Sequence, residues 1–263
     1  MSRLDEEITA VVLTLGEPSF DRCIEALEAQ SVQPAHRVVV GPEVRDGFHA
    51  AFNHGVSLVE TEYVLQLDGD MLMDPDCVQI LKGGMEANTG VSLGLLEDPL
   101  LGNIQGIKLF RTEVFRQKPF PPTLTTDTDR IRDFGQEGYE IALVQRSKPA
   151  YGHSPDVLGH HQPPYEDPIV LFGRFFRLGK KARARQSYQE FAGILARLRR
   201  SAHPGAEMAI VALVQGVMSD EPAGVHGALT RRTELDRLLA FQALESPTAK
   251  DRATTWVKRT VDG

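Results

Sequence analysis

Three short runs of aliphatic and β-branched residues alternate with two segments of helical periodicity near the N-terminus. This alternation constrains the fold more than any other feature of the sequence. The runs are residues 8–13, 36–40 and 63–67, and the helical segments are residues 19–30 and 48–59. A continuous apolar run bounded by turn residues is typical of a strand buried on both faces. Strands and helices that alternate in this way predict a Rossmann-like α/β fold, with a mostly parallel central sheet and helices on both faces.

The character of the sequence changes near residue 168. Before that point we expect a helix over 75–81, strands over 90–95, 107–110 and 139–144, a helix over 129–136, and irregular chain over 118–128 and 145–168. After it, apolar residues recur at helical spacing and strand-like runs are few, which predicts three or four helices. We therefore expect two domains, residues 1–168 with the sheet and a helical C-terminal extension over residues 169–263.

Composition excludes several classes of protein. The formal net charge is −7 and the isoelectric point is about 5.6, which disfavours general nucleic-acid binding. Neither Cys23 nor Cys77 lies in a spacing that binds metal, so both are expected to be buried thiols. The N-terminus lacks the pattern of a secretion signal, and no apolar run reaches the length of a membrane span. These features predict a cytoplasmic location.

An Asp-Gly-Asp triplet, Asp68-Gly69-Asp70, follows the third run directly. Ligands of such sheets bind at the carboxyl ends of the strands, where this triplet is expected to lie. Two carboxylates around a glycine suit a hard divalent cation, whose shell the phosphates of a substrate can complete. An isolated Asp-Gly after a strand is nevertheless most often an ordinary turn, so the surrounding residues decide its meaning.

Residues 53–81, which read NHGVSLVETEYVLQLDGDMLMDPDCVQIL, closely resemble the donor-site segment of family 2 glycosyltransferases. The resemblance extends over about residues 8–165 and implies the GT-A fold. It also implies Mn²⁺ or Mg²⁺ on Asp70 and Asp68, and transfer with inversion from a UDP- or GDP-type sugar to an acceptor hydroxyl. The donor nucleotide is then expected to contact Thr14, Leu15, Glu17, Asp46, Asn53, Asp68 and Gly69. The loop GPEVRDG departs from the family pattern, so the nucleotide itself stays open.

A second block, residues 127–141, reads DTDRIRDFGQEGYEI and is similar to the acceptor-side segment of the same family. The resemblance implies that Asp127 is the general base on the acceptor hydroxyl, with Asp129 beside it as a second catalytic candidate. Alternatively, both carboxylates simply begin the helix that follows, since acidic side chains favour helix N-termini. The family usually has an acidic residue just before the base, where this chain has Thr126.

Two adjacent histidines, His160 and His161, follow in a polar segment. In several GT-A enzymes a histidine beyond the acceptor segment completes the metal shell, so one of the pair, with His161 favoured, is expected to bind the cation. An imidazole ligand favours Mn²⁺ over Mg²⁺, which prefers oxygen ligands. The other interpretation is that both histidines are structural.

Residues 170–200 carry nine lysines and arginines and one acidic residue, Glu190. Such a tract suits peripheral contact with an anionic membrane surface, such as the inner face of the membrane. We favour a solvated basic face, or a helix that docks on the acidic remainder of the chain. The C-terminal helices also offer a surface for homo-oligomers.

The expected function is therefore a metal-dependent glycosyltransferase whose partners are a nucleotide sugar and a hydroxyl-bearing acceptor, with no nucleic acid. One alternative is a non-catalytic nucleotide-sugar-binding or assembly scaffold, which the loss of an acidic residue at Thr126 favours. A sugar nucleotidyltransferase is the other alternative. It is disfavoured because the segment TLGEPSFD lacks the glycine-rich, basic loop expected after the first strand.

Overall fold

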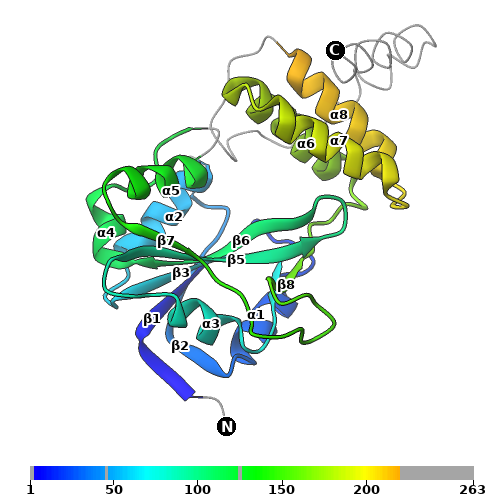
Figure 1. Ribbon diagram of the computed structural model, residues 1–263. Helices are drawn as coiled ribbons and strands as arrows, with labels where there is room; N and C mark the ends of the chain where they lie inside the picture. Colours follow the sequence, from blue (N-terminus) through cyan, green and yellow to red (C-terminus); the bar gives the residue numbers. More distant parts are fainter. Residues whose placement is uncertain (1–2, 45–46, 124–125, 220–263) are drawn as a thin grey trace, which may run out of the picture. The chain divides into compact units, whose positions relative to one another are not determined.

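The computed structural model describes residues 3–44, 47–123 and 126–219. This part of the chain forms two compact units, one ending at Pro163 and the other beginning at Pro164. The predicted domain boundary at residue 168 stays a prediction. Each unit is described by itself below, and Figure 1 shows the elements in both.

The first unit is built on one eight-stranded sheet. Its strand order is β2 (Val32–Val40), β1 (Arg3–Leu13), β3 (Tyr63–Asp68), β6 (Gly102–Arg111), β5 (Thr89–Asp98), β8 (Val157–His161) and β4 (Met71–Met73), with β7 (Glu140–Leu143) beside β5. Leu13 pairs with both Val40 and Asp68, so the carboxyl ends of the three parallel strands meet at one edge. The sheet is more mixed than the expected mostly parallel one, because β6 runs antiparallel to both β3 and β5.

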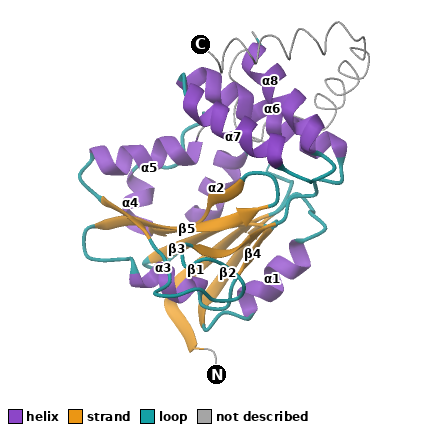
Figure 2. Ribbon diagram, turned by 45° about the vertical axis from the view of Figure 1, so that its right-hand side comes forward, coloured by secondary structure: helices purple, strands orange, loops and turns teal. Residues whose placement is uncertain are grey.

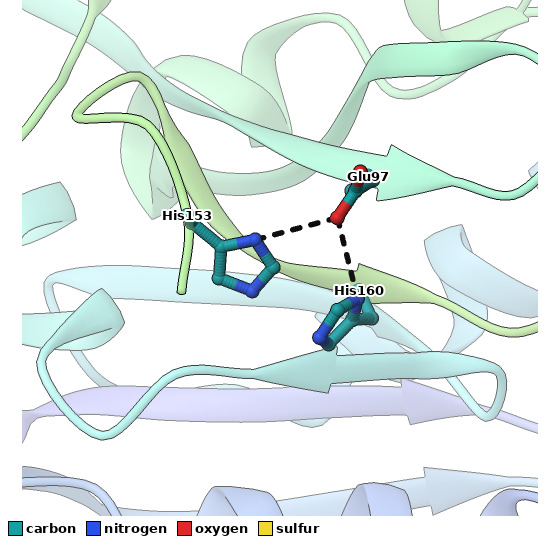
Figure 3. A group of neighbouring side chains, drawn as sticks. All are labelled: Glu97, His153 and His160. Atoms are coloured by element: carbon teal, nitrogen blue, oxygen red, sulfur yellow. Dashed lines mark ion pairs between the residues drawn. The ribbon is translucent and has the colours of Figure 1, made fainter. Parts of the chain in front are cut away.

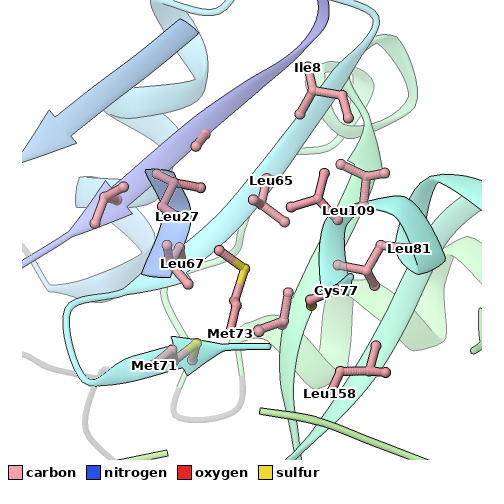
Figure 4. Close-up of a cluster of buried hydrophobic side chains, with 14 of the residues drawn as sticks. Ile8, Leu27, Leu65, Leu67, Met71, Met73, Cys77, Leu81, Leu109 and Leu158 are labelled. Atoms are coloured by element: carbon pink, nitrogen blue, oxygen red, sulfur yellow. The ribbon is translucent and has the colours of Figure 1, made fainter. Parts of the chain in front are cut away.

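Helices cover both faces of the sheet, which confirms the predicted α/β class (Figure 2). Successive residues of a strand point to opposite faces, and β1 therefore supplies both cores. Ile8, Ala10 and Val12 pack with α1 (Phe20–Glu28) and α3 (Cys77–Gly83), in the cluster drawn in Figure 4. Val11 and Leu13 pack with α2 (Phe48–Ser57), α4 (Thr112–Gln117) and α5 (Thr126–Gln136). Cys23 and Cys77 are buried free thiols, as predicted.

Two strands were not predicted from the sequence. β8 lies within the stretch 145–168, which was expected to be irregular, and β4 begins directly after Asp70. The two pair antiparallel, with Met71 opposite His161 and Met73 opposite Gly159. Their partners are distant in sequence, so local periodicity carried no sign of the pairing.

The second unit contains three helices, α6 (Pro168–Arg185), α7 (Tyr188–Arg200) and α8 (Ala206–Met218), in agreement with the expected C-terminal helices. Asp167 caps α6, because its Oδ1 accepts a hydrogen bond of 2.9 Å from the amide of Ile169. α6 and α8 touch backbone to backbone: a Cβ on Gly216 would lie 2.0 Å from the carbonyl oxygen of Phe176. Among the residues that the structure describes, no helix combines the length and apolar character that crossing a bilayer requires.

Candidate functional site

The Asp68-Gly69-Asp70 turn is fixed to the end of β1. The amide of Gly69 donates to the carbonyl oxygen of Leu13 at 2.8 Å, and the hydroxyl of Ser19 donates to the carbonyl oxygen of Gly69 at 3.1 Å. A Cβ on Gly69 would lie 2.7 Å from Oε2 of Glu17. A side chain at this position would therefore displace the Glu17 carboxylate from the place it holds beside the turn.

That loop is organised by Glu17. Its Oε2 accepts hydrogen bonds from the hydroxyl of Thr14 at 2.7 Å and from the amide of Leu15 at 3.0 Å. The structure thus brings Thr14, Leu15, Glu17 and Gly69 together at the carboxyl edge of the parallel strands. These are four of the residues expected to contact the nucleotide.

Asp68 has the features of a carboxylate that binds a cation. Its Oδ1 is buried and has no hydrogen-bond partner among the described residues. The pKa of the Asp68 carboxyl is raised to about 7, chiefly by burial and also by the charges of Asp70 and Glu17, while Lys108 and His161 oppose the rise. Collected carboxylates with a buried, unbonded oxygen match the oxygen ligands that divalent cations prefer.

His161 adds a nitrogen to this group. Its Nε2 lies 3.2 Å from Oδ2 of Asp70, and its Nδ1 lies 2.7 Å from Oδ2 of Asp98, which is fully buried. The other oxygen of Asp98 accepts hydrogen bonds from the amides of Leu100 and Leu101, at 2.8 and 2.7 Å. A carboxylate behind an imidazole in this way fixes the ring and its tautomer, as the outer partners of metal ligands do. Sequence reasoning missed Asp98, whose only sequence signal is an acid followed by Pro-Leu-Leu-Gly.

His160 lies apart from this group, so of the two histidines only His161, the one favoured from the sequence, is placed beside Asp70 in the described part of the chain. His160 follows Gly159 on the exposed side of β8 and lies 3.8 Å from Glu97, measured from Nδ1 to Oε2. The reason is the alternation of side chains along a strand. We therefore leave His160 out of the proposed donor site.

Asp127 lies at the start of α5, opposite the middle of β6. Its Oδ2 is 3.4 Å from Nζ of Lys108, a side chain only 2% exposed, and its Oδ1 accepts a hydrogen bond of 2.8 Å from the amide of Thr128. Lys108 also lowers the pKa of Asp68. The buried ammonium thus acts on one carboxylate from each half of the predicted site. Sequence reasoning missed Lys108, for which a lone cation within an apolar strand was the available signal.

Asp129 has structural partners. Its Oδ2 accepts a hydrogen bond of 2.8 Å from the hydroxyl of Thr123, and its Oδ1 pairs with Arg132 at 3.2 Å, one turn along the helix. The departure at Thr126 also has a local cause. Its buried hydroxyl lies 3.0 Å from the carbonyl oxygen of Pro121 and 2.7 Å from that of Thr123. A carboxylate there would face two carbonyl oxygens, so Thr126 suits this loop better than an acid.

Two predicted nucleotide contacts are not part of this group. The side chain of Asn53 holds the backbone of Phe120 at both ends, at 3.0 Å to its carbonyl oxygen and 2.9 Å from its amide. Asn53 therefore fixes the loop that leads to α5, and we leave it out of the proposed nucleotide site. Asp46 lies outside the described residues.

Comparison with known proteins adds three findings. Residues 17–118 match the model of glycosyl transferase family 2, whereas no curated protein sequence matches the chain. The structure resembles the mannosyltransferase PcManGT from Pyrobaculum calidifontis, solved with GDP-Man and Mn²⁺, with a TM-score of 0.52 and 16% identity over 97% of this chain and 84% of that one.

Weaker likenesses include two further solved structures. Glucosyl-3-phosphoglycerate synthase from Mycobacterium tuberculosis, with Mn²⁺, UDP and phosphoglyceric acid, gives a TM-score of 0.45 at 15% identity over 65% of this chain and 78% of that one. TarS 1–349 from S. aureus gives 0.43 at 13% identity over 80% and 70%. The family match contains the Asp-Gly-Asp turn, and the first likeness establishes the fold. The chain therefore has the GT-A fold, and its residues 17–118 match the model of glycosyl transferase family 2.

Proposed function

We propose that this protein transfers a sugar, with inversion, from a UDP- or GDP-linked donor to an acceptor hydroxyl in a reaction that depends on Mn²⁺ or Mg²⁺. One observation carries the proposal. Asp68, Asp70 and His161 converge at the carboxyl edge of the sheet, beside the Thr14–Glu17 loop, and a buried oxygen of Asp68 has no hydrogen-bond partner among the described residues.

In the donor half, Asp70 and His161 hold the cation directly and Asp68 assists. When bound there, the cation neutralises the charge that develops on the leaving nucleoside diphosphate. Asp98 keeps the Nε2 lone pair of His161 turned toward Asp70 by holding Nδ1. The backbone of Gly69 and the loop from Thr14 to Glu17 form the wall against which the nucleotide lies.

The relative bound to GDP-Man and Mn²⁺ supports this choice of ligands, since its fold covers nearly the whole chain. The imidazole of His161 favours Mn²⁺ over Mg²⁺. The proposal includes both UDP and GDP donors. The loop expected to distinguish them contains Asp46, which lies outside the described residues.

In the acceptor half, Asp127 takes the proton of the attacking hydroxyl. A sugar hydroxyl is a poor nucleophile until a positioned base accepts its proton. Asp127 is the carboxylate to which the resemblance gives this role, and its Oδ2 lies 3.4 Å from Lys108, which also acts on Asp68 in the donor half, whereas Asp129 bonds Thr123 and Arg132. The ammonium of Lys108, on β6, attracts the carboxylate of Asp127 toward the sheet.

The test is calorimetric titration of UDP and of GDP into wild-type protein, Asp70→Asn and the exposed control Asp21→Asn, each with and without Mn²⁺. We expect Mn²⁺-dependent binding of at least one nucleotide, lost in Asp70→Asn and kept in Asp21→Asn. Equal binding by Asp70→Asn would remove the metal assignment. Hydrolysis of the matching nucleotide sugar in the presence of Mn²⁺ separates an enzyme from a binding scaffold, which would retain the donor intact.

A further inference from the structure

We propose that Glu97, His153 and His160 form a second cation site, for a transition-metal ion of the Zn²⁺ class, on the outer side of β8. The inference does not rest on the proposed function, because none of these residues belongs to the donor site or the acceptor site. Figure 3 shows the three side chains turned toward a common point from β5, from the loop before β8 and from β8 itself.

The spacing of the three side chains suits one small ion. Oε2 of Glu97 lies 3.5 Å from Nδ1 of His153 and 3.8 Å from Nδ1 of His160. The ligand atoms that the three residues offer all lie within 4.8 Å of one another. Zinc bonds of about 2.0–2.2 Å in a tetrahedral shell place neighbouring ligand atoms about 3.4 Å apart. The two separations from Glu97 therefore exceed that spacing by only tenths of an ångström, and the side chains of Glu97 and His160, both about half exposed, can turn to bring the two imidazoles to the same spacing.

His153 shows the features of a positioned ligand. Its side chain is 4% exposed, and its Nε2 makes no hydrogen bond within the described part of the chain. That nitrogen lies 3.6 Å from Oδ1 of Asp74, and Arg146 holds the other oxygen of Asp74 at 2.8 Å. A carboxylate behind the far nitrogen of an imidazole is the usual outer partner of a metal-bound histidine. The near nitrogen, Nδ1, is thereby left directed at Glu97.

Glu97, whose side chain is 55% exposed, faces two imidazoles. Among the described residues its ion-pair partners are the two imidazoles, and no lysine or arginine pairs with it. The nearby arginine, Arg146, is already engaged by Asp74 and Asp76. Two imidazoles and one carboxylate form the protein ligand set of several zinc sites that keep an open fourth position.

The two proposed cation sites share strands but not faces. Glu97 and Asp98 are neighbours on β5, and His160 and His161 are neighbours on β8, where Glu97 pairs with His160. Because successive side chains alternate, Asp98 and His161 turn toward Asp70, whereas Glu97 and His160 turn toward His153. One pair of strands thus presents a carboxylate and an imidazole on each side.

The experiment is titration of metal-free protein with Zn²⁺ against a chromogenic chelator, using wild type, His160→Gln and Glu97→Gln. Asp70→Asn controls for zinc bound at the donor site. His36→Gln is the matched control for a surface pair, because His36 also faces a glutamate, Glu6, at 3.7 Å with both side chains exposed. We expect His160→Gln and Glu97→Gln to lose one equivalent of tightly bound Zn²⁺ that Asp70→Asn and His36→Gln retain.

A spectroscopic readout accompanies the titration. Co²⁺ bound by two imidazoles and a carboxylate should give visible ligand-field bands in wild type and Asp70→Asn, and none from this site in His160→Gln. Circular dichroism and the melting temperature in chelator verify that the variants fold, which the half-exposed position of His160 favours. Unchanged zinc stoichiometry and affinity in both His160→Gln and Glu97→Gln would overturn the proposal. So would loss of the tight equivalent in Asp70→Asn alone.

Discussion

Lys108 is a buried cation between two carboxylates with different tasks. Its Nζ donates to the carbonyl oxygen of Gly106 at 3.0 Å and lies 3.4 Å from Asp127, and its charge lowers the pKa of Asp68. A buried charge is costly unless it is paired and hydrogen-bonded. The charge of Lys108 therefore acts both on Asp68, in the donor turn, and on Asp127, at the start of α5.

Asp127→Asn keeps the shape of the side chain and removes its basicity. We expect the rate of sugar transfer to fall by about 10²–10⁴, the usual contribution of a general base. Affinity for nucleotide and Mn²⁺ should change little, since the base acts on the acceptor. Turnover and nucleotide affinity, measured separately, give the two readouts.

Asp129→Asn is the control for that variant. It should impair transfer less, because Asp129 bonds Thr123 and Arg132. An inactive Asp129→Asn beside a normal Asp127→Asn would mean that the two roles are reversed. Full activity in both variants would leave only the donor half of the proposal.

Asp68 predicts a pH dependence of stability in the metal-free protein. Its pKa in the folded state, about 7, lies above that of an unfolded aspartate, about 3.9. The folded state therefore binds this proton more tightly. The contribution of Asp68 to the free energy of unfolding is complete below pH 4 and is lost as the pH rises through 7.

In chelator, wild-type protein should lose more stability between pH 5 and pH 8 than Asp68→Asn does. Denaturant unfolding of both proteins at several pH values measures the difference. Parallel profiles for the two proteins would show that Asp68 titrates as an ordinary aspartate in the folded state.

At the scale of the element, the β4–β8 pair places His161. Gln162 donates its amide to the carbonyl oxygen of Asp70 at 2.7 Å, so the end of β8 is tied to the Asp-Gly-Asp turn. Gly159 has a φ of +154°, and a Cβ there would lie 2.2 Å from the carbonyl oxygen of Leu72. Only a glycine lets the two strands come this close.

Gly159→Ala should therefore separate β4 from β8 and displace His161 from Asp70. We expect a loss of about 1–3 kcal/mol in the free energy of unfolding, the range for strained backbone, and weaker Mn²⁺-dependent nucleotide binding. Gly193→Ala is the control, because a Cβ on Gly193 would meet nothing within 4 Å. Wild-type nucleotide binding by Gly159→Ala would contradict this role for the strand pair.

Local patterns in the sequence predicted the elements whose signals lie within one segment. The runs that became β1, β2 and β3 and the helices between them were found, together with the position of Asp68 at a strand end. β8 was missed because its five residues end in Gly-His-His and gain their partners from β4 and β5. The same lack of local signal hid Asp98 and Lys108, whose roles depend on strands that meet only in the folded chain.

At the scale of the molecule, the two compact units each have helices or strands packed around their own buried side chains. The predicted metal and nucleotide ligands that the structure describes all lie in the first unit. The close contact of α6 and α8 lies within the second, at Gly179 and Gly216. A chain with more than one compact unit often departs from two-state unfolding.

Scanning calorimetry should therefore resolve two unfolding transitions. Nucleoside diphosphate with Mn²⁺ should raise the melting temperature of the first unit only. At 100 times the dissociation constant, the ligand adds about 2.7 kcal/mol to the free energy of unfolding of that unit. Gly216→Ala should lower only the other transition, since its Cβ would collide with Phe176. A single transition that both changes move together would show that the units unfold as one.

His160 and His161 are adjacent on β8, and they therefore face opposite sides of the sheet. The number of residues in the loop before β8 thus matters as much as their identity. Losing one residue between Ser154 and Asp156 could pull the strand one position along its neighbours, and such a slip turns every side chain to the opposite face. His161 would then take the place of His160 beside Glu97, and Gln162 would take the place of His161 beside Asp70. The protein would keep all its ligand residues and most of its sheet, but the imidazole beside Asp70 would be lost. Length variation in this loop is therefore expected to be selected against more strongly than substitution within it.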